Sequence, residues 1–192
     1  MVSIRNSAQP VGDRILDAAA ACVLAYGVER MTLTEIARRA RVSRPTIYRR
    51  WPDIRYVLAE LLTVRIVGVL DDVEARGVDR EALVARIVTV ADRVRHDEVI
   101  MSVLHNAPSV AMVYITERLG TSQQILIDAV ADAIKLGQEE GSVRDGEPQQ
   151  LAAMCLLITQ SAIQSAQIVE QILDADALAV ELAYSLNGYL KP

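Results

Sequence analysis

The segment that most restricts the fold is residues 32–51, where two short helix signals are separated by only three residues. The first signal is a capping box, in which the Thr32 hydroxyl accepts from the backbone three residues on and the Glu35 carboxylate reaches back. Ser43 can cap the second helix. Trp51 ends it, because the residue before a proline avoids helical angles. Two short helices joined in this way predict a helix-turn-helix.

The rest of the chain also has a helical pattern, because apolar residues recur at spacings of three and four almost throughout. Hydrophobic residues make up 52% of the chain, enough for a sizeable core, and the absence of Phe makes that core aliphatic. No segment has the alternation of a strand. We expect an all-α protein of about nine helices, with a three-helix helix-turn-helix domain over 1–52 and a helical domain over 53–192. Residues 1–10 are expected to form a flexible arm.

Charge is distributed unevenly along the chain. The first 56 residues hold ten arginines against five acidic residues, whereas the remainder holds ten basic residues against twenty acidic ones. The overall net charge of −5 hides this contrast. A basic first segment on an acidic remainder predicts that only the first segment meets a polyanion.

The second short helix has the composition of a helix that reads DNA. A recognition helix enters the major groove with its N-terminal end toward the base edges, where Arg44 and Thr46 lie. Arginine can bind guanine through two hydrogen bonds, and threonine can offer a hydroxyl or a methyl group to thymine. Ile47 should point inward, against Ile36 and Ala37. The side chains expected to face outward or sideways, toward phosphates, are Tyr48, Arg49 and Arg50, although Tyr48 could instead pack at a junction with the following domain.

The stretch "GVERMTLTEIARRARVSRPTIYRRWPD" (27–53) resembles the signature of TetR-type transcriptional repressors. The matching positions are Gly27, Thr32, Leu33, Ile36, Ala37, Val42, Ser43, Thr46, Ile47, Tyr48 and Trp51. The resemblance implies a DNA-binding head, a divergent helical body that binds a small ligand, and a homodimer formed by the last two helices. The resemblance, together with the positions of the basic side chains, predicts the residues that contact DNA. They are Thr32, Thr34, Arg44, Pro45, Thr46, Tyr48, Arg49, Arg50 and Arg55.

Two positions depart from the family pattern. Arg41 stands where the turn commonly has glycine, and a non-glycine residue there is strained if the backbone needs a positive φ. Ile54 stands where the family often has lysine, so that Arg55 or Arg50 would have to replace a phosphate contact. Arg41, with Arg38 and Arg39, could also belong to a solvated face.

The last two helices are expected to form a two-fold interface. The helix at 148–171 is apolar on more than one face, and a second copy of the chain is a natural cover for one of them. A hairpin within a monomer is the alternative. The predicted interface residues are Ala162, Ser165, Val169, Leu178, Leu182, Ala183, Leu186 and Leu190.

A ligand pocket is expected among the middle helices, with a mostly apolar effector. Methionines adapt to irregular apolar ligands, and His105 adds a polar group to an apolar neighbourhood, although a core histidine is the default interpretation. The candidate lining residues are Met101, Leu104, His105, Met112, Tyr114, Met154 and Ile158.

Other classes of function find little support. The chain has no nucleophile motif and no phosphate-binding glycine loop, so we expect neither an enzyme nor a cofactor. Two distant histidines build no metal site, and Cys22 and Cys155 are expected to be buried thiols in a reducing compartment. The longest apolar run (151–158) is too short to span a bilayer, and the N-terminus lacks the apolar core of a signal peptide. We therefore expect a cytoplasmic, ligand-responsive regulator bound to a palindromic operator, the alternative being a helical ligand-binding or scaffold protein that has lost DNA binding.

Overall fold

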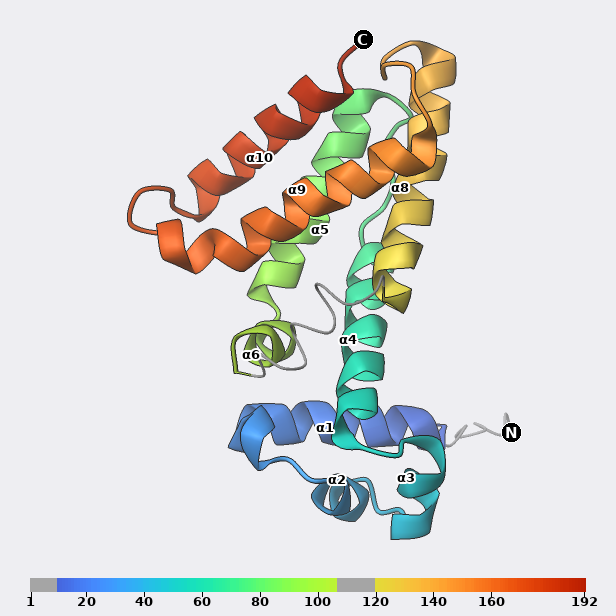
Figure 1. Ribbon diagram of the computed structural model, residues 1–192, viewed down its shortest axis with the longest axis vertical. Coiled ribbons are helices and arrows are strands. Elements are labelled where there is room, and N and C mark those ends of the chain that lie inside the picture. Colours follow the sequence, from blue (N-terminus) through green and yellow to red (C-terminus); the bar gives the residue numbers. More distant parts are fainter. Residues whose placement is uncertain (1–9, 107–119) are drawn as a thin grey trace, which may run out of the picture.

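The computed structural model describes residues 10–106 and 120–192. Within these ranges it contains nine α-helices, one short 3-10 helix and no strand, so the expected all-α fold is confirmed. Three helices form a head at one end of an elongated molecule, and α4 leads from them into the remaining helices, the body (Figure 1). The sequence pattern also predicts a helix over about 109–118, and this stretch lies outside the described residues.

The head comprises the first three helices and packs around the recognition helix. Ile36 and Ile47 are fully buried in one cluster with Ala37, as the spacing predicts. A short 3-10 turn that the sequence pattern did not predict follows Gly27, whose φ of 73° suits glycine. The head elements are α1 (Val11–Tyr26), η1 (Val28–Arg30), α2 (Leu33–Arg39) and α3 (Arg44–Arg50).

The predicted caps of the two short helices form. The Thr32 hydroxyl accepts from the Glu35 backbone N–H at 3.1 Å, and the Ser43 hydroxyl accepts from the Thr46 backbone N–H at 3.3 Å. The carboxylate of Glu35 binds Arg38 through two hydrogen bonds of 2.9 and 2.6 Å. The capping box predicts that the Glu35 carboxylate accepts from the Thr32 backbone N–H. In the structure the carboxylate instead forms an ion pair with Arg38 on the helix surface.

The body consists of six described helices, of which α4 also belongs to the head core. Val57, Leu58, Leu61 and Leu62 of α4 are buried, and they join the cluster that contains Ile47. A second cluster unites α5, α8, α9 and α10. The body helices are α4 (Ile54–Asp71), α5 (Arg80–His96), α6 (Glu98–Asn106), α8 (Thr121–Glu140), α9 (Pro148–Val169) and α10 (Ala175–Leu190).

The sequence pattern predicts a helix over about 54–75, but α4 ends earlier, at Asp71. Arg86 of α5 donates to the carbonyl oxygens of Val73 and Leu70, at 3.0 and 3.3 Å. These bonds satisfy carbonyl groups at the end of the helix and hold the loop that follows. Because α4 links the head to α5, this end is fixed within the body.

Candidate nucleic-acid interface and internal cavity

The N-terminal end of α3 lies at an exposed surface of the head. Arg44 and Pro45 are exposed, and half of the Tyr48 surface is accessible, at 50%. Within the described residues, neither Arg44 nor Arg49 makes an ion pair or a hydrogen bond. These two guanidinium groups carry positive charge that the folded chain does not use.

The threonines of the predicted interface are partly committed to capping. The Thr46 hydroxyl lies 2.7 Å from the Ser43 hydroxyl, so one of its hydrogen bonds is made within the protein. Thr32 accepts the capping bond of α2, and Thr34 is half-buried in the first turn of that helix. A hydroxyl has one donor and two acceptor positions, so each retains capacity for one further contact.

Arg50 is exposed but is also paired within the protein, which the sequence pattern did not predict. Its Nη2 lies 2.6 Å from Oε1 of Glu60 on α4, and its guanidinium stacks on the Trp51 ring at 4.6 Å from the centroid. The indole N–H of Trp51 donates to the other carboxylate oxygen of Glu60 at 2.7 Å, and Trp51 is only 2% exposed. Gly12 of α1 lies so close that a Cβ there would stand 2.5 Å from an Arg50 nitrogen. Arg50 therefore joins α1, α3 and α4, and Trp51 is a packing residue.

The two departures from the family pattern have clear structural consequences. Arg41 has a φ of 54°, and it is the one non-glycine residue with positive φ within the described ranges. Ile54 is half-buried and packs against the head core. Arg55 pairs with Asp53 at 2.9 Å, and this hydrogen-bonded pair lowers the pKa of Asp53.

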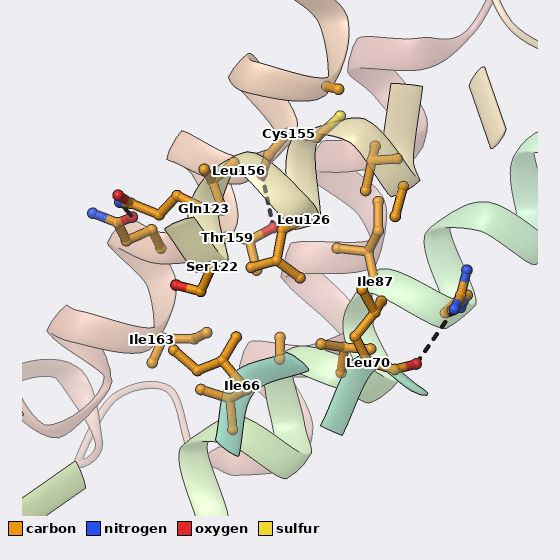
Figure 2. Close-up of a pocket in the computed structure, with 18 of the residues that line it drawn as sticks. Ile66, Leu70, Ile87, Ser122, Gln123, Leu126, Cys155, Leu156, Thr159 and Ile163 are labelled. Atoms are coloured by element: carbon orange, nitrogen blue, oxygen red, sulfur yellow. Dashed lines mark hydrogen bonds between the residues drawn. The ribbon is translucent and has the colours of Figure 1, made fainter. Parts of the chain in front are cut away.

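An apolar cavity of about 130 Å³ lies in the body between α4, α5, α6, α8 and α9. Figure 2 shows aliphatic side chains around it, including Ile66, Ile87 and Leu126, with polar groups from the start of α8 and from α9. The Cys155 thiol also lines the cavity, and burial raises its pKa to about 11, so it is protonated at neutral pH. The polar lining residues are Ser122, Gln123, Thr159, Gln160, Gln164 and Arg86.

Only one of the described residues predicted to line a pocket does so. Leu104 is on the cavity wall, whereas Met101 and Ile158 are half-buried elsewhere, and His105 and Met154 are exposed. These helices are apolar on two faces, and the sequence pattern did not show which face is internal. Met112 and Tyr114 lie outside the described residues. The glutamines were missed because amides in a helix resemble solvated surface residues, although Gln123 so near the start of α8 was an available signal.

Part of the predicted interface stripe of α10 is buried within the chain itself. Leu182, Leu186 and Leu190 are buried in the chain's own core, because they are the strongest apolar stripe of that helix. Ala162, Val169, Leu178 and Ala183 are half-buried, and Ser165 is exposed. A different face is apolar and open: it contains Met154, Leu157 (58% exposed) and Ile168 of α9 with Val180 and Tyr184 (77% exposed) of α10. We call these five residues the outer face.

Helix α9 is long and apolar enough, by length and composition, to cross a membrane, although its longest apolar run is short. A single helix of this kind is weak evidence for a membrane span, because helices of globular proteins pass the same test. Within the described residues, no group of three or more histidine, cysteine or acidic side chains could hold a metal ion.

Comparison with known proteins matches both the head and the whole chain. The profile of bacterial regulatory proteins of the tetR family matches residues 15–61, which include α2 and α3. An HTH-type transcriptional regulator of Mycobacterium tuberculosis is 59% identical over 190 residues, covering 99% of this chain and 100% of the relative. The chain belongs to the TetR family of bacterial regulatory proteins.

Solved TetR-family structures share the fold over almost the full length. RolR, solved with resorcinol, has a TM-score of 0.70 and 18% identity, covering 94% of this chain and 87% of its own. FadR of Thermus thermophilus, solved with lauroyl-CoA, has a TM-score of 0.68 and 22% identity, covering 93% and 92%. At these identities the likeness concerns the fold. As a TetR-family protein, the chain is a DNA-binding, helix-turn-helix transcriptional regulator.

Proposed function

We propose that this TetR-family protein is a cytoplasmic repressor that binds a palindromic operator as a homodimer and is released by a small, mostly apolar molecule. The observation that carries this proposal is the connection between two sites. Arg44 and Arg49, which have no side-chain partner within the described residues, lie at one end of the molecule, and an apolar cavity lies in the body against α4. RolR and FadR, solved with small ligands, support a ligand-responsive body by analogy.

Helix α6 provides a physical link from the cavity to the head. Ile100 and Leu104 line the cavity, whereas Val99 and Val103 on the same helix belong to the core cluster that contains the head. The start of α6 is anchored by Asp97, which accepts from the Ile100 backbone N–H at 2.9 Å and pairs with Arg65 of α4 at 2.6 Å. A ligand that displaces the cavity wall would therefore shift α6 and α4 together.

The proposed response is a shift between two populations of the dimer. Two heads read half-sites about 34–36 Å apart, one turn of DNA. A ligand releases DNA only if it binds more tightly to a dimer with a different head spacing. The outer face would join the two copies, with the small side chains Ser161 and Ser165 of α9 permitting close approach of the helices.

Fluorescence anisotropy with the DNA upstream of the gene tests the DNA-binding part. We expect specific binding that weakens steeply as salt rises, because each phosphate contact releases a counterion. Equal, weak binding to random DNA would instead favour the scaffold alternative, for which the strained Arg41 is the structural argument.

Two variants separate base readout from phosphate contact. Arg44→Ala should cost about 1–3 kcal/mol and relax the preference for one base pair, whereas Tyr48→Phe should weaken all sequences alike. Arg76→Ala is the matched control, because Arg76 is an exposed arginine of the body. Unchanged base preference in Arg44→Ala would remove Arg44 from the readout.

A further inference from the structure

The size of the cavity limits the part of a ligand that it can enclose. Its volume of about 130 Å³ is close to that of the engineered cavity of about 150 Å³ that binds benzene. By that comparison, the cavity can hold a ligand group of roughly six to nine non-hydrogen atoms. A six-membered ring with one substituent fits this range, and a long acyl chain exceeds it.

The wall excludes most charged ligands. Most of its described side chains are aliphatic, and no acidic group is among them. Arg86 is the one charged side chain of the described lining, and it already donates to the Val73 and Leu70 carbonyl oxygens at the end of α4. The dashed line at Leu70 in Figure 2 marks the second of these bonds. A carboxylate would lose its hydration and would have to compete with those carbonyl groups for Arg86.

The hydrogen bonds of the Gln123–Gln160 pair fix which group of Gln160 remains available for a ligand. The Gly120 backbone N–H can only donate, and it donates to Oε1 of Gln123 at 2.8 Å. The amide nitrogen of Gln123 must then be the donor to Gln160, at 2.9 Å from Oε1. The amide nitrogen of half-buried Gln160 is left without a hydrogen-bond partner in the part of the chain that the structure describes.

The hydroxyl of the adjacent residue, Thr159, does not accept a hydrogen bond from the Gln160 amide nitrogen. Thr159 donates its proton to the Cys155 carbonyl oxygen at 2.8 Å, within α9. Gln160 therefore offers N–H groups beside an aliphatic cavity, and the complementary ligand atom is a hydrogen-bond acceptor.

From this geometry we infer that the cavity takes an uncharged, compact, mostly aliphatic molecule with one acceptor oxygen, such as a ketone, ester or ether, which binds the Gln160 amide. This inference rests on the proposed function, because it names the effector class for the same cavity. It distinguishes this chain from a receptor for anionic ligands or for coenzyme A thioesters.

Three probes of equal heavy-atom number test the inference on the full-length protein: acetylcyclohexane, cyclohexanecarboxylate and isopropylcyclohexane. Their dissociation constants can be measured by titration and ligand-observed NMR, with lauroyl-CoA as a fourth probe. We expect the ketone to bind three- to tenfold more tightly than the hydrocarbon, the range of one net hydrogen bond, and at least tenfold more tightly than the carboxylate. Stronger binding of the carboxylate or of lauroyl-CoA, or no binding of the ketone, overturns the inference.

Variants locate the contact. Gln160→Leu should reduce ketone affinity to that of the hydrocarbon, whereas Gln167→Leu, the same change at an exposed position of α9, should have no effect. Ala129→Leu, which adds volume at the cavity wall, should weaken all probes that bind. A melting temperature for each variant shows that it is folded, and equal loss in Gln160→Leu and Gln167→Leu would contradict a contact at Gln160.

The same samples separate this inference from the proposed function. If the ketone binds as expected but does not release operator DNA, the ligand class stands and the effector role fails. If operator DNA is bound specifically but the ketone does not bind, the regulator stands and the ligand class fails.

Discussion

The head and the body use arginine differently. In the body, Arg86, Arg93 and Arg144 donate to backbone carbonyl oxygens at loops and helix ends, and so hold neighbouring segments together. In the head, Arg14 and Arg39 also donate to backbone carbonyl oxygens, but Arg44 and Arg49 of α3 have no such partner within the described residues. The positive charge of the head is therefore not explained by folding alone, and a polyanionic partner is the physical use that remains for it.

Hydrophobic side chains show the opposite contrast. The head buries its apolar groups in one core around Ile47 and Trp51, whereas the body leaves both an internal cavity and the apolar outer face. A cavity forgoes dispersion contacts, and an exposed apolar patch forgoes hydrophobic burial. The cavity and the outer face therefore each lower the stability of the body, and each is suited to bind a partner: a small molecule in the cavity and a second copy of the chain on the outer face.

The largest expected effect tests whether the head depends on its junction with α4. Trp51→Ala removes a buried ring and the indole donor to Glu60, and it should lower the free energy of unfolding by about 3–5 kcal/mol. Tyr56→Ala is the control on the adjacent turn of α4, where the side chain is 52% exposed, with an expected change within about 0.5 kcal/mol. Urea unfolding followed by circular dichroism measures both, and similar losses would mean that Trp51 is not a structural anchor.

The next effect tests the outer face of the body. Leu157→Glu places a carboxylate in the proposed interface of each copy, which should weaken dimerisation by about 2–4 kcal/mol without unfolding the chain. Light scattering should then show a shift from a dimer toward the monomer mass of 21.0 kDa. Leu136→Glu is the matched control, because Leu136 is 48% exposed on α8. A dimer that survives Leu157→Glu, or that dissociates equally in the control, would place the interface elsewhere.

A smaller effect concerns the thiol in the cavity wall. Burial raises the pKa of the Cys155 thiol in the folded state to about 11, whereas the ordinary value of 9.0 is expected in the unfolded chain. Between pH 9 and 11 the unfolded chain releases this proton first, so stability should fall as pH rises, by roughly 2 kcal/mol over that window. Cys155→Ala should have a smaller decline than the parent protein, measured by urea unfolding at each pH. Identical slopes would show that burial does not control this thiol.

The accuracy of the sequence-based predictions also differs between head and body. In the head, local signals determine the structure: Ser43 caps a helix, Ile47 faces inward, and Arg41 takes the positive φ that a glycine-preferring turn requires. Such signals act over a few residues and can be recognised without knowledge of the tertiary fold. The Arg50–Glu60 ion pair was not predicted, because Glu60 lies on the next helix and no local pattern pairs the two residues.

In the body, the sequence indicated the helices but not their orientation. Helix α10 has a leucine stripe ending at Leu190 and a weaker stripe with Val180 and Tyr184, and only packing shows that the first is internal. The cavity depends on five helices at once, so His105 and Met154 could not be assigned from periodicity. Features that depend on several distant helices are the ones that sequence patterns missed.

The smallest effect separates strain from function at Arg41. A left-handed backbone costs a non-glycine residue about 1–2 kcal/mol, and glycine loses about 0.5–1 kcal/mol more conformational entropy on folding. Arg41→Gly should therefore stabilise the head by about 0.5–1 kcal/mol, whereas Arg41→Ala keeps the positive φ of 54° and should not. Differential scanning calorimetry can compare both with the parent protein.

Operator affinity of the same two variants then shows why an arginine occupies this strained position. Both variants lack the guanidinium group, so a phosphate contact by Arg41 would make both bind DNA more weakly by the same factor, with a shallower salt dependence. If Arg41 belongs only to a solvated face, both should bind as tightly as the parent protein, and the strain would have no compensating function in DNA binding. A loss confined to Arg41→Gly would indicate instead that the turn needs a stiffer residue to hold α3 against α2.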